Sequence, residues 1–243
     1  LKDGNIYSAP LDDIGTATYL GNWSETVTAQ GGETVNNFRL NYADGYMYML
    51  DDAQNFYRFD LHDCKLEYAF TVTLTNPNTT SAGYNKTHDF AIHKDGTFYV
   101  LNKGYTKKYL YLYQFTLNDV QTYENADGTT TVGIRDLAPI FNDKNGYMDL
   151  LGGYNPYQMF WDHDKEILYM VRNYATNVSG ATQSILYTID VTTGQPAGAF
   201  YMEGVNGNGS NPNGNPFFAI LKDGTPYIGN KGDYEAVKDN LYE

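Results

Sequence analysis

The chain has 243 residues, of which 16% are aromatic and only 19% charged, and its formal net charge is −13. A field this negative disfavours nucleic acid and anionic membranes as partners, and no apolar run of about 18 residues is present that could cross a bilayer. A chain of this length can bury a sizeable core, so we expect one domain over residues 1–243.

The chain opens on two short segments, 5–11 and 16–20, that we expect to form outer strands. The first begins with Asn5-Ile6-Tyr7, and the same pattern of Asn, an apolar residue and Tyr recurs at Asn240-Leu241-Tyr242. The chain therefore starts and ends at nearly the same phase of a repeat. Either the first segments complete the unit that begins at residue 215, or the chain is a segment of a longer array.

A strand–turn–strand pattern then occurs four times along the chain. Its copies are residues 38–49, 89–100, 158–170 and 217–228. Three of the four turns contain Asp-Gly, which favours two-residue hairpins because Gly accepts a positive φ. The third turn, Asp164-Lys165-Glu166, is one residue longer.

The second strand of each copy is apolar on both faces. Its recurring tyrosines are Tyr48, Tyr99, Tyr169 and Tyr227, and the residues beside them on the other face are Met47, Phe98, Leu168 and Pro226. A strand that is apolar on both faces lies between two packed layers. This arrangement is typical of an inner strand in a propeller blade.

A second pattern follows three of the copies and alternates with period two. It covers residues 55–61, 111–117 and 185–191, with Tyr57, Tyr113 and Tyr187 in one column, and each copy runs into a turn and another strand. We therefore predict an all-β protein, a β-propeller of about four four-stranded blades or a four-repeat segment of a larger propeller. The expected blades are residues 36–74, 87–140, 155–203, and 215–243 completed by 5–20.

The strand–Asp-Gly–strand pattern, with Leu186-Tyr187-Thr188-Ile189-Asp190 and Thr192-Thr193-Gly194 after it, resembles bacterial secreted or surface β-propellers with YVTN or quinoprotein-like blades. The resemblance extends over nearly the whole chain, and its motifs are generic. It implies a propeller fold and a secreted or cell-surface location, but no activity.

Candidate site residues lie at the start of the first strand of each unit, which would line a central channel. One level holds Asn37, His88, Tyr157 and Pro216, and the next holds Phe38, Asp89, Gln158 and Phe217. His88-Asp89 is the most specific pair, because a carboxylate beside an imidazole can orient a general base. Neighbouring residues on a strand point to opposite faces, however, which favours a structural role for this pair.

Aromatic residues in or beside the long connections form a second set of candidates. They are Trp23, Tyr84, Tyr105, Tyr147, Tyr154, Tyr157 and Tyr174. Tyrosine and tryptophan offer flat, amphipathic faces to sugar rings or peptides. We therefore predict that ligand binding involves Asn37, His88, Asp89, Tyr157, Gln158, Trp23 and Tyr154.

Metal and nucleophile motifs are weak. Residues 143–149 have the Asp, Asn and Gly of a calcium loop but lack its leading Asp-x-Asp and final Glu, so we favour a turn without metal and expect no cofactor. Asp162-His163-Asp164 is expected to be a solvated turn. No Gly-x-Ser-x-Gly motif occurs, and Cys64, the single cysteine, has only His62 near it in sequence, which disfavours serine or cysteine hydrolysis.

Three functions remain open. The first is a non-enzymatic, exported or cell-surface module that binds glycan or protein through its loops or channel mouth. The second is a structural segment of a larger surface assembly, with further domains as partners, and the matching ends of the chain suggest it. The third is a carbohydrate-active enzyme that uses His88, Asp89, Tyr157 and Gln158 over the channel.

Overall fold

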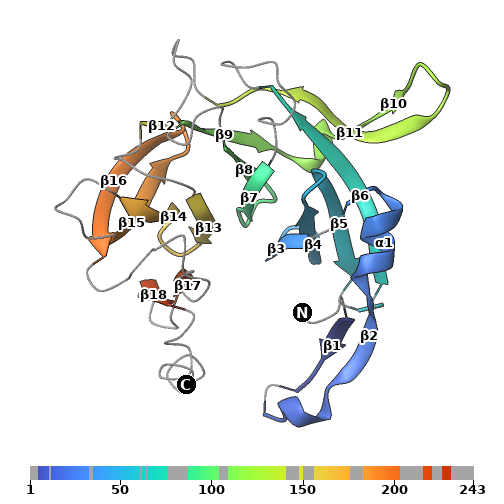
Figure 1. The fold of residues 1–243 in the computed structure, drawn as a ribbon, viewed down its shortest axis with the longest axis horizontal. Coiled ribbons are helices and arrows are strands. Elements are labelled where there is room, and N and C mark those ends of the chain that lie inside the picture. Colours follow the sequence, from blue (N-terminus) through green and yellow to red (C-terminus); the bar gives the residue numbers. More distant parts are fainter. Residues whose placement is uncertain are drawn as a thin grey trace. The chain divides into compact units, whose positions relative to one another are not determined.

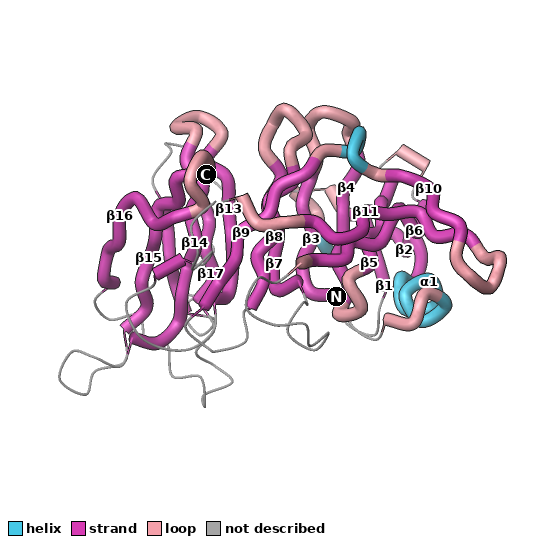
Figure 2. Tube along the Cα trace, turned by 90° about the horizontal axis from the view of Figure 1, so that it is seen from above, coloured by secondary structure: helices cyan, strands magenta, loops and turns pink. Residues whose placement is uncertain are grey.

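The computed structural model describes most of the chain. The described residues are 5–10, 12–32, 35–60, 62–63, 65–75, 87–103, 109–140, 148–149, 156–175, 183–202, 216–220 and 226–230. They fall into two compact units: unit 1 draws on Leu1–Thr75, Ile92–Phe98 and Phe115–Leu137, and unit 2 on Asn76–Ala91, Tyr99–Gln114 and Ala138–Glu243. Strands make up most of the described trace (Figure 2), which confirms the predicted all-β class.

Three larger sheets and two hairpins contain all the described strands (Figure 1). Sheet 1 has the order β10-β11-β6-β5-β4-β3, sheet 2 has β12-β9-β8-β7, and sheet 3 has β13-β14-β15-β16, while β1-β2 and β17-β18 are two-stranded. The strand bounds are β1 Asn5–Ser8, β2 Thr18–Asn22, β3 Val35–Leu40, β4 Tyr46–Asp51, β5 Asn55–Asp60, β6 Lys65–Leu74, β7 Thr87–Ile92, β8 Phe98–Lys103, β9 Tyr109–Phe115, β10 Gln121–Glu124, β11 Thr130–Leu137, β12 Met148–Asp149, β13 Pro156–Asp162, β14 Ile167–Ala175, β15 Gln183–Asp190, β16 Gln195–Met202, β17 Pro216–Ile220 and β18 Pro226–Asn230.

Two antiparallel meanders lie where four-stranded units were predicted. Strands β3 to β6 correspond to the unit expected at 36–74, and β13 to β16 correspond to the unit expected at 155–203. Strands β1 and β2 pair with each other, and so do β17 and β18. Ring closure, in which 5–20 completes the last unit, stays a prediction.

The boundary predicted for the second unit, 87–140, is wrong at its end. The hairpin β10-β11 belongs to sheet 1, where β11 runs parallel to β6, and the fourth strand of sheet 2 is β12 (Figure 1). The period-two pattern predicts only that 111–117 runs into a turn and another strand. It carries no information about which sheet edge that strand joins.

The turns differ from the predicted two-residue hairpins. The β3–β4 loop closes with the Asn41 amide donating to the Tyr46 carbonyl (2.9 Å), and the β7–β8 loop closes with the His93 amide donating to the Thr97 carbonyl (2.8 Å). These loops therefore have four and three residues. The positive φ predicted for the glycines is confirmed at Gly45 (79°) and Gly96 (90°), whereas a type I′ turn would need it at two successive residues.

Each larger sheet has two apolar faces. We call one of them the tyrosine face, because it carries the recurring tyrosine of β5, β9 or β15. The tyrosine face carries Tyr57 in sheet 1, Tyr113 in sheet 2 and Tyr187 in sheet 3, and all three are buried. The other side is called the opposite face, and in sheet 1 it carries Phe56 and Phe70. This confirms the prediction that the central strands lie between two layers.

In each pair of successive sheets, the opposite face of the earlier sheet packs on the tyrosine face of the later sheet. In unit 1, Phe56 and Phe70 of sheet 1 contact Phe98 and Phe115 of sheet 2, with the Phe70 and Phe115 ring centroids 5.7 Å apart. In unit 2, Ala91, Tyr99, Leu101 and Leu112 of sheet 2 share one buried cluster with Met159, Leu168, Met170, Tyr187 and Ile189 of sheet 3. The same packing direction is therefore repeated along the chain.

The tyrosine face of sheet 1 is covered by elements from the beginning of the chain. Helix α1 (Trp23–Ala29) contributes the fully buried Val27, and Ile6 and Leu20 from the β1-β2 hairpin pack against the same cluster. Asn22 begins the helix, since its side chain accepts a hydrogen bond from the Ser24 amide (2.8 Å). In unit 1, α1 and the β1-β2 hairpin therefore cover the face on which another sheet would otherwise pack.

A buried carboxylate, Asp51, connects sheet 1 to this covering layer. Its oxygens accept hydrogen bonds from the amides of Ala53 and Asn55, from Asn55 Nδ2 and from the Tyr57 hydroxyl. Asn55 Nδ2 also donates to the Gln30 carbonyl at the end of α1 (3.2 Å). Burying a charge is unfavourable unless it is paired or hydrogen-bonded, so these donors allow Asp51 to remain in the interior.

Candidate functional site

The strands β3 and β13 are irregular at the end where the channel-mouth residues were predicted. Each has one residue more than its partner strand: Asn36 in β3 and Tyr157 in β13. A bulge of this kind changes the direction of neighbouring side chains and is frequent beside functional sites. The predicted residues Asn37, Tyr157 and Gln158 therefore lie at or next to a bulge.

Asp89 has a clear role in the packing of unit 2. It lies on β7 and is fully buried, with Oδ1 accepting from the Phe90 amide (2.7 Å) and Oδ2 from the Met159 amide (2.6 Å). Met159 belongs to β13, so the carboxylate joins the inner strands of sheets 2 and 3. Amide hydrogen bonds to a charged oxygen are among the stronger ones in proteins. This geometry supports the structural interpretation of His88-Asp89 over a general-base pair.

The other predicted site residues are distributed over both units. Asn37 lies on β3 in unit 1, whereas His88 on β7 and Tyr157 and Gln158 on β13 lie in unit 2, where the Asp89–Met159 hydrogen bond brings their strands together. Tyr174, expected in a connection, is part of β14. Tyr154, Tyr84, Tyr105 and Tyr147 lie outside the described residues.

Trp23 was predicted in or beside a long connection, and it lies in the segment between β2 and β3. Trp23 is the first residue of α1, and its half-buried side chain packs against the cluster on the tyrosine face of sheet 1. Helix propensity does not predict this helix, since Trp, Thr and Val are weak helix formers. The signal that could have found it is Asn22, an N-cap residue with Glu25 three positions later, as in a capping box.

Four exposed aromatic residues were not predicted as surface residues. Their exposed fractions are 55% for Tyr7, 55% for Tyr19, 62% for Tyr42 and 57% for Phe200. Tyr7 and Tyr19 face each other across the β1-β2 hairpin with ring centroids 5.6 Å apart in an edge-to-face arrangement. Sequence periodicity places Tyr7 in a core column and cannot show that no layer covers it.

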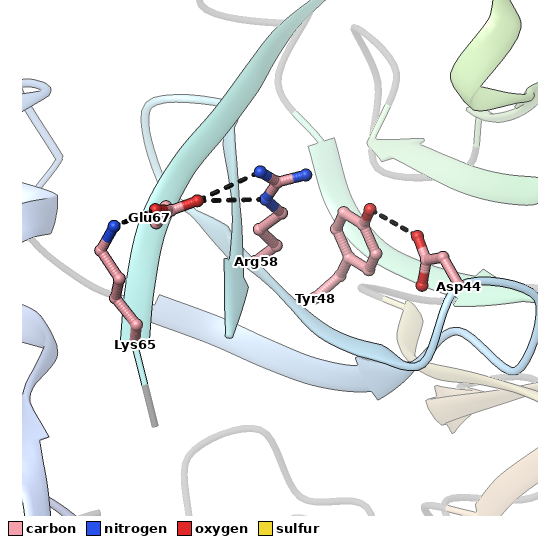
Figure 3. Close-up of polar contacts among 5 residues, drawn as sticks. All are labelled: Asp44, Tyr48, Arg58, Lys65 and Glu67. Atoms are coloured by element: carbon pink, nitrogen blue, oxygen red, sulfur yellow. Dashed lines mark hydrogen bonds and ion pairs between the residues drawn. The ribbon is translucent and has the colours of Figure 1, made fainter. Parts of the chain in front are cut away.

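A polar network lies on the opposite face of sheet 1 (Figure 3). Glu67 accepts from Arg58 Nη2 at 3.1 Å and is also paired with Lys65, and the Arg58 guanidinium lies over the Tyr46 ring, 4.9 Å from its centroid. Hydrogen bonds from Lys65 and then Arg58 hold the pKa of the Glu67 carboxyl below its usual range. Half-exposed ion pairs contribute little to stability, so this network mainly fixes side-chain positions.

Beside this network, Tyr48 donates a hydrogen bond to Asp44 Oδ2 (2.8 Å; Figure 3). Burial, followed by the hydrogen bond to Asp44, raises the pKa of the Tyr48 hydroxyl far above its ordinary value. The phenol is therefore neutral throughout the physiological range. This hydrogen bond links Asp44 in the β3–β4 turn to Tyr48 on β4.

The described residues contain no group of three or more His, Cys, Asp or Glu side chains arranged to hold a metal ion. The expected turn covers 163–166, but Asp162, the last residue of β13, is buried (2% exposed) and not solvated. Its Oδ1 accepts from the amides of Asp164 and Lys165, and its Oδ2 pairs with Lys165 Nζ (3.2 Å). Of the segment weighed as a calcium loop, 143–147 lies outside the described residues, and Met148–Asp149 is strand β12. Within the described chain, no helix is long and apolar enough to cross a membrane.

Comparisons with known proteins bear on the fold. No family model and no curated protein match the sequence. Among solved structures, the chain is similar to a protein of unknown function from Bacteroides thetaiotaomicron (11% identity, TM-score 0.50), with 94% of this chain and 50% of that chain covered.

Two further matches are weaker. They are hydrazine synthase from Kuenenia stuttgartiensis (10% identity, TM-score 0.42, 81% of this chain and 55% of that chain) and a protein from Lactobacillus plantarum (16%, 0.40, 79% and 47%). The chain thus spans about half the length of these solved structures. The likeness to the Bacteroides structure supports a β-propeller-type fold and nothing finer.

Proposed function

We propose that the chain is a non-enzymatic β-propeller module, secreted or at the cell surface, that binds a glycan or protein at the channel mouth formed by the starts of its inner strands. The observation that carries this proposal is the bulge at Tyr157, which lies two residues before the buried Asp89–Met159 hydrogen bond. A rigid frame beside an irregular strand start is a common way to present ligand-binding residues.

The role of Asp89 favours binding over catalysis. Both oxygens of its carboxylate accept backbone amides, and a carboxylate used in this way holds strands in place. The carbohydrate-active alternative requires it to orient His88 instead. We therefore rank the enzyme last, and rank a structural segment of a larger surface assembly second.

Binding to glycan arrays and to a panel of surface proteins tests the proposal, with Tyr157→Ala as the site variant. Loss of one aromatic contact is worth about 1 kcal/mol, so we expect affinity to fall roughly fivefold. The matched control is Tyr42→Ala, because Tyr42 is exposed in the β3–β4 turn, in unit 1 rather than on β13. Equal affinities of the two variants, or polysaccharide turnover that His88→Ala abolishes, would contradict the proposal.

The number of blades belongs to the same proposal. We take the chain to supply about four blade units, of which sheets 1 to 3 are complete and the fourth begins with β17-β18. The strands β13 and β14 of sheet 3 adjoin β17, as expected if this hairpin starts the next blade. A hairpin of the β1-β2 type would supply the outer half.

A further inference from the structure

Two contacts show how β7 and β13 are aligned within unit 2. Asp89 of β7 accepts a hydrogen bond from the Met159 amide of β13 (2.6 Å). Two residues later on both strands, Ala91 belongs to a buried cluster against which Trp161 packs. Tyr99 of the same cluster, which is opposite Ala91 in the β7–β8 hairpin, has its ring centroid 5.4 Å from that of Trp161. The two strands therefore run in the same direction and in step.

This alignment places Thr87, at the start of β7, beside the bulge residue Tyr157. Side chains on a strand alternate between two faces, so Thr87 lies on the same face as Asp89 and Ala91, toward sheet 3. In a regular β13, the Tyr157 amide would be placed relative to Thr87 as the Met159 amide is placed relative to Asp89. The bulge takes Tyr157 out of this register.

The hydroxyl of Thr87 is buried without a hydrogen-bond partner. The residue is 7% exposed, and none of the residues that the structure describes bonds its Oγ1. A buried hydroxyl that makes no hydrogen bond lowers stability, because it loses its contacts with water and gains none in exchange. The start of β7 therefore holds an unused donor and acceptor beside the candidate site.

We propose that Thr87 is a ligand-contacting residue of the channel mouth, and that its hydroxyl forms a hydrogen bond with a hydroxyl group of a neutral glycan. This inference rests on the proposed function and names the ligand class of that same site. Because no hydrogen bond fixes Oγ1, rotation about χ1 can turn it toward a ligand at the strand start without breaking one. The ligand then supplies the partner that the fold does not.

The charges around the site favour an uncharged ligand. Both oxygens of Asp89 accept backbone amides and the residue is 0% exposed, so its charge is not presented to a basic group of a protein ligand. The net charge of −13 disfavours acidic sugars. A threonine hydroxyl both donates and accepts, as a sugar hydroxyl does. A neutral glycan therefore fits this position better than an acidic glycan or a protein bound through Lys or Arg.

Thr87→Val tests the contact, since valine has nearly the shape of threonine and lacks the hydroxyl. On an array of neutral and acidic oligosaccharides, we expect the unmodified chain to bind neutral members. The neutral oligosaccharide bound most strongly is then titrated, and Thr87→Val should bind it about fivefold more weakly. Thr87→Ser keeps the hydroxyl and should keep most of the affinity.

Urea unfolding of the same variants gives a readout that does not need a ligand. Thr87→Val should raise the urea concentration at the unfolding midpoint, because it removes a buried hydroxyl that has no partner. The matched control is Thr71→Val in unit 1, where Thr71 Oγ1 donates to Asn55 Oδ1 (2.6 Å). This control should lower the midpoint and leave glycan binding unchanged.

The outcomes separate this inference from the proposed function. Neutral-glycan binding that Thr87→Val leaves unchanged would overturn the inference while the module still binds. Binding of acidic glycans or of a protein alone would do the same. A lower unfolding midpoint for Thr87→Val would show that the fold itself uses the hydroxyl, and would overturn the inference whatever the array shows. An absence of binding to every glycan and protein tested would contradict the proposed function, and this inference with it.

Discussion

At the scale of single residues, the structure shows glycines whose backbone lies so close to other atoms that a side chain would not fit. Gly32, just after α1, lies against the Asp51 carboxylate, and a Cβ there would come within 2.1 Å of Asp51 Oδ2 and 2.8 Å of a Val27 methyl carbon. The amide of Gly32 also bonds the Val27 carbonyl (3.1 Å). The residue is therefore fixed between the helix and the buried carboxylate.

We expect Gly32→Ala to destabilise the chain by about 1–3 kcal/mol, because added atoms force a packed interior to shift. Urea unfolding followed by tryptophan fluorescence measures this change, since Trp23 packs in the same layer. Gly21→Ala is the matched control, because a Cβ at Gly21 meets nothing within 4 Å. Equal loss of stability in the two variants would contradict the packing described here.

The candidate site shows how far residue types predict function. The column count places Asn37, His88 and Tyr157 near the starts of strands, and they lie on β3, β7 and β13. It could not show that Asp89 accepts a hydrogen bond from the Met159 amide, because that bond joins residues 70 positions apart. Nor could it distinguish Tyr7 from Tyr57, since both occupy the same pattern and differ in what covers them.

At the scale of elements, local patterns predict strands well and their partners poorly. Alternation and turn residues place the β3–β6 and β13–β16 meanders to within one residue at each end. The attachment of β10-β11 to β6 is different, because an edge strand is selected by backbone geometry that side-chain periodicity does not encode. The seven-residue helix α1 is held by packing of Val27, so propensity alone does not predict it.

Gly133 on β11 is where this attachment can be tested. A Cβ at Gly133 would lie 2.1 Å from the Thr71 carbonyl oxygen of β6, so Gly133→Ala should separate the two strands. We expect amides of β10 and β11 to lose hydrogen-exchange protection while those of β4 and β5 keep theirs. Thr130→Ala, at an exposed position of β11, should leave protection unchanged, and a similar loss there would argue against the close approach.

At the scale of the whole molecule, acidic turns couple stability to pH. Amide hydrogen bonds from Asp63 and His62 lower the pKa of Asp60, and one from Thr192 lowers that of Asp190. Burial alone would raise the pKa of Asp95, but hydrogen bonds from His93 and Thr97 together bring it below its ordinary value of 3.8. Folding therefore favours the ionised form of each carboxyl.

The sign of the effect follows from these directions. A carboxyl whose pKa is lower in the folded state stabilises the fold fully above its unfolded pKa, near 3.8 for Asp, and loses this contribution as the pH falls through the folded value. We expect the urea concentration at the unfolding midpoint to be independent of pH above that value and to decrease as the pH is lowered further. Asp60→Asn combined with Asp190→Asn should flatten the decline, and an unchanged acid limb would refute the assignment.

The covering of sheet 1 by α1 has a consequence for the order in which the structure opens. One face of sheet 1 is sealed by Val27, Ile6 and Leu20, whereas Phe200 on β16, the last strand of sheet 3, is 57% exposed. In repeat architectures each layer is stabilised mainly by its neighbours, so the layer with one neighbour fewer melts first. In isolated chains, β15 and β16 should therefore fray before β4 and β5, which gives the molecule a direction of unfolding.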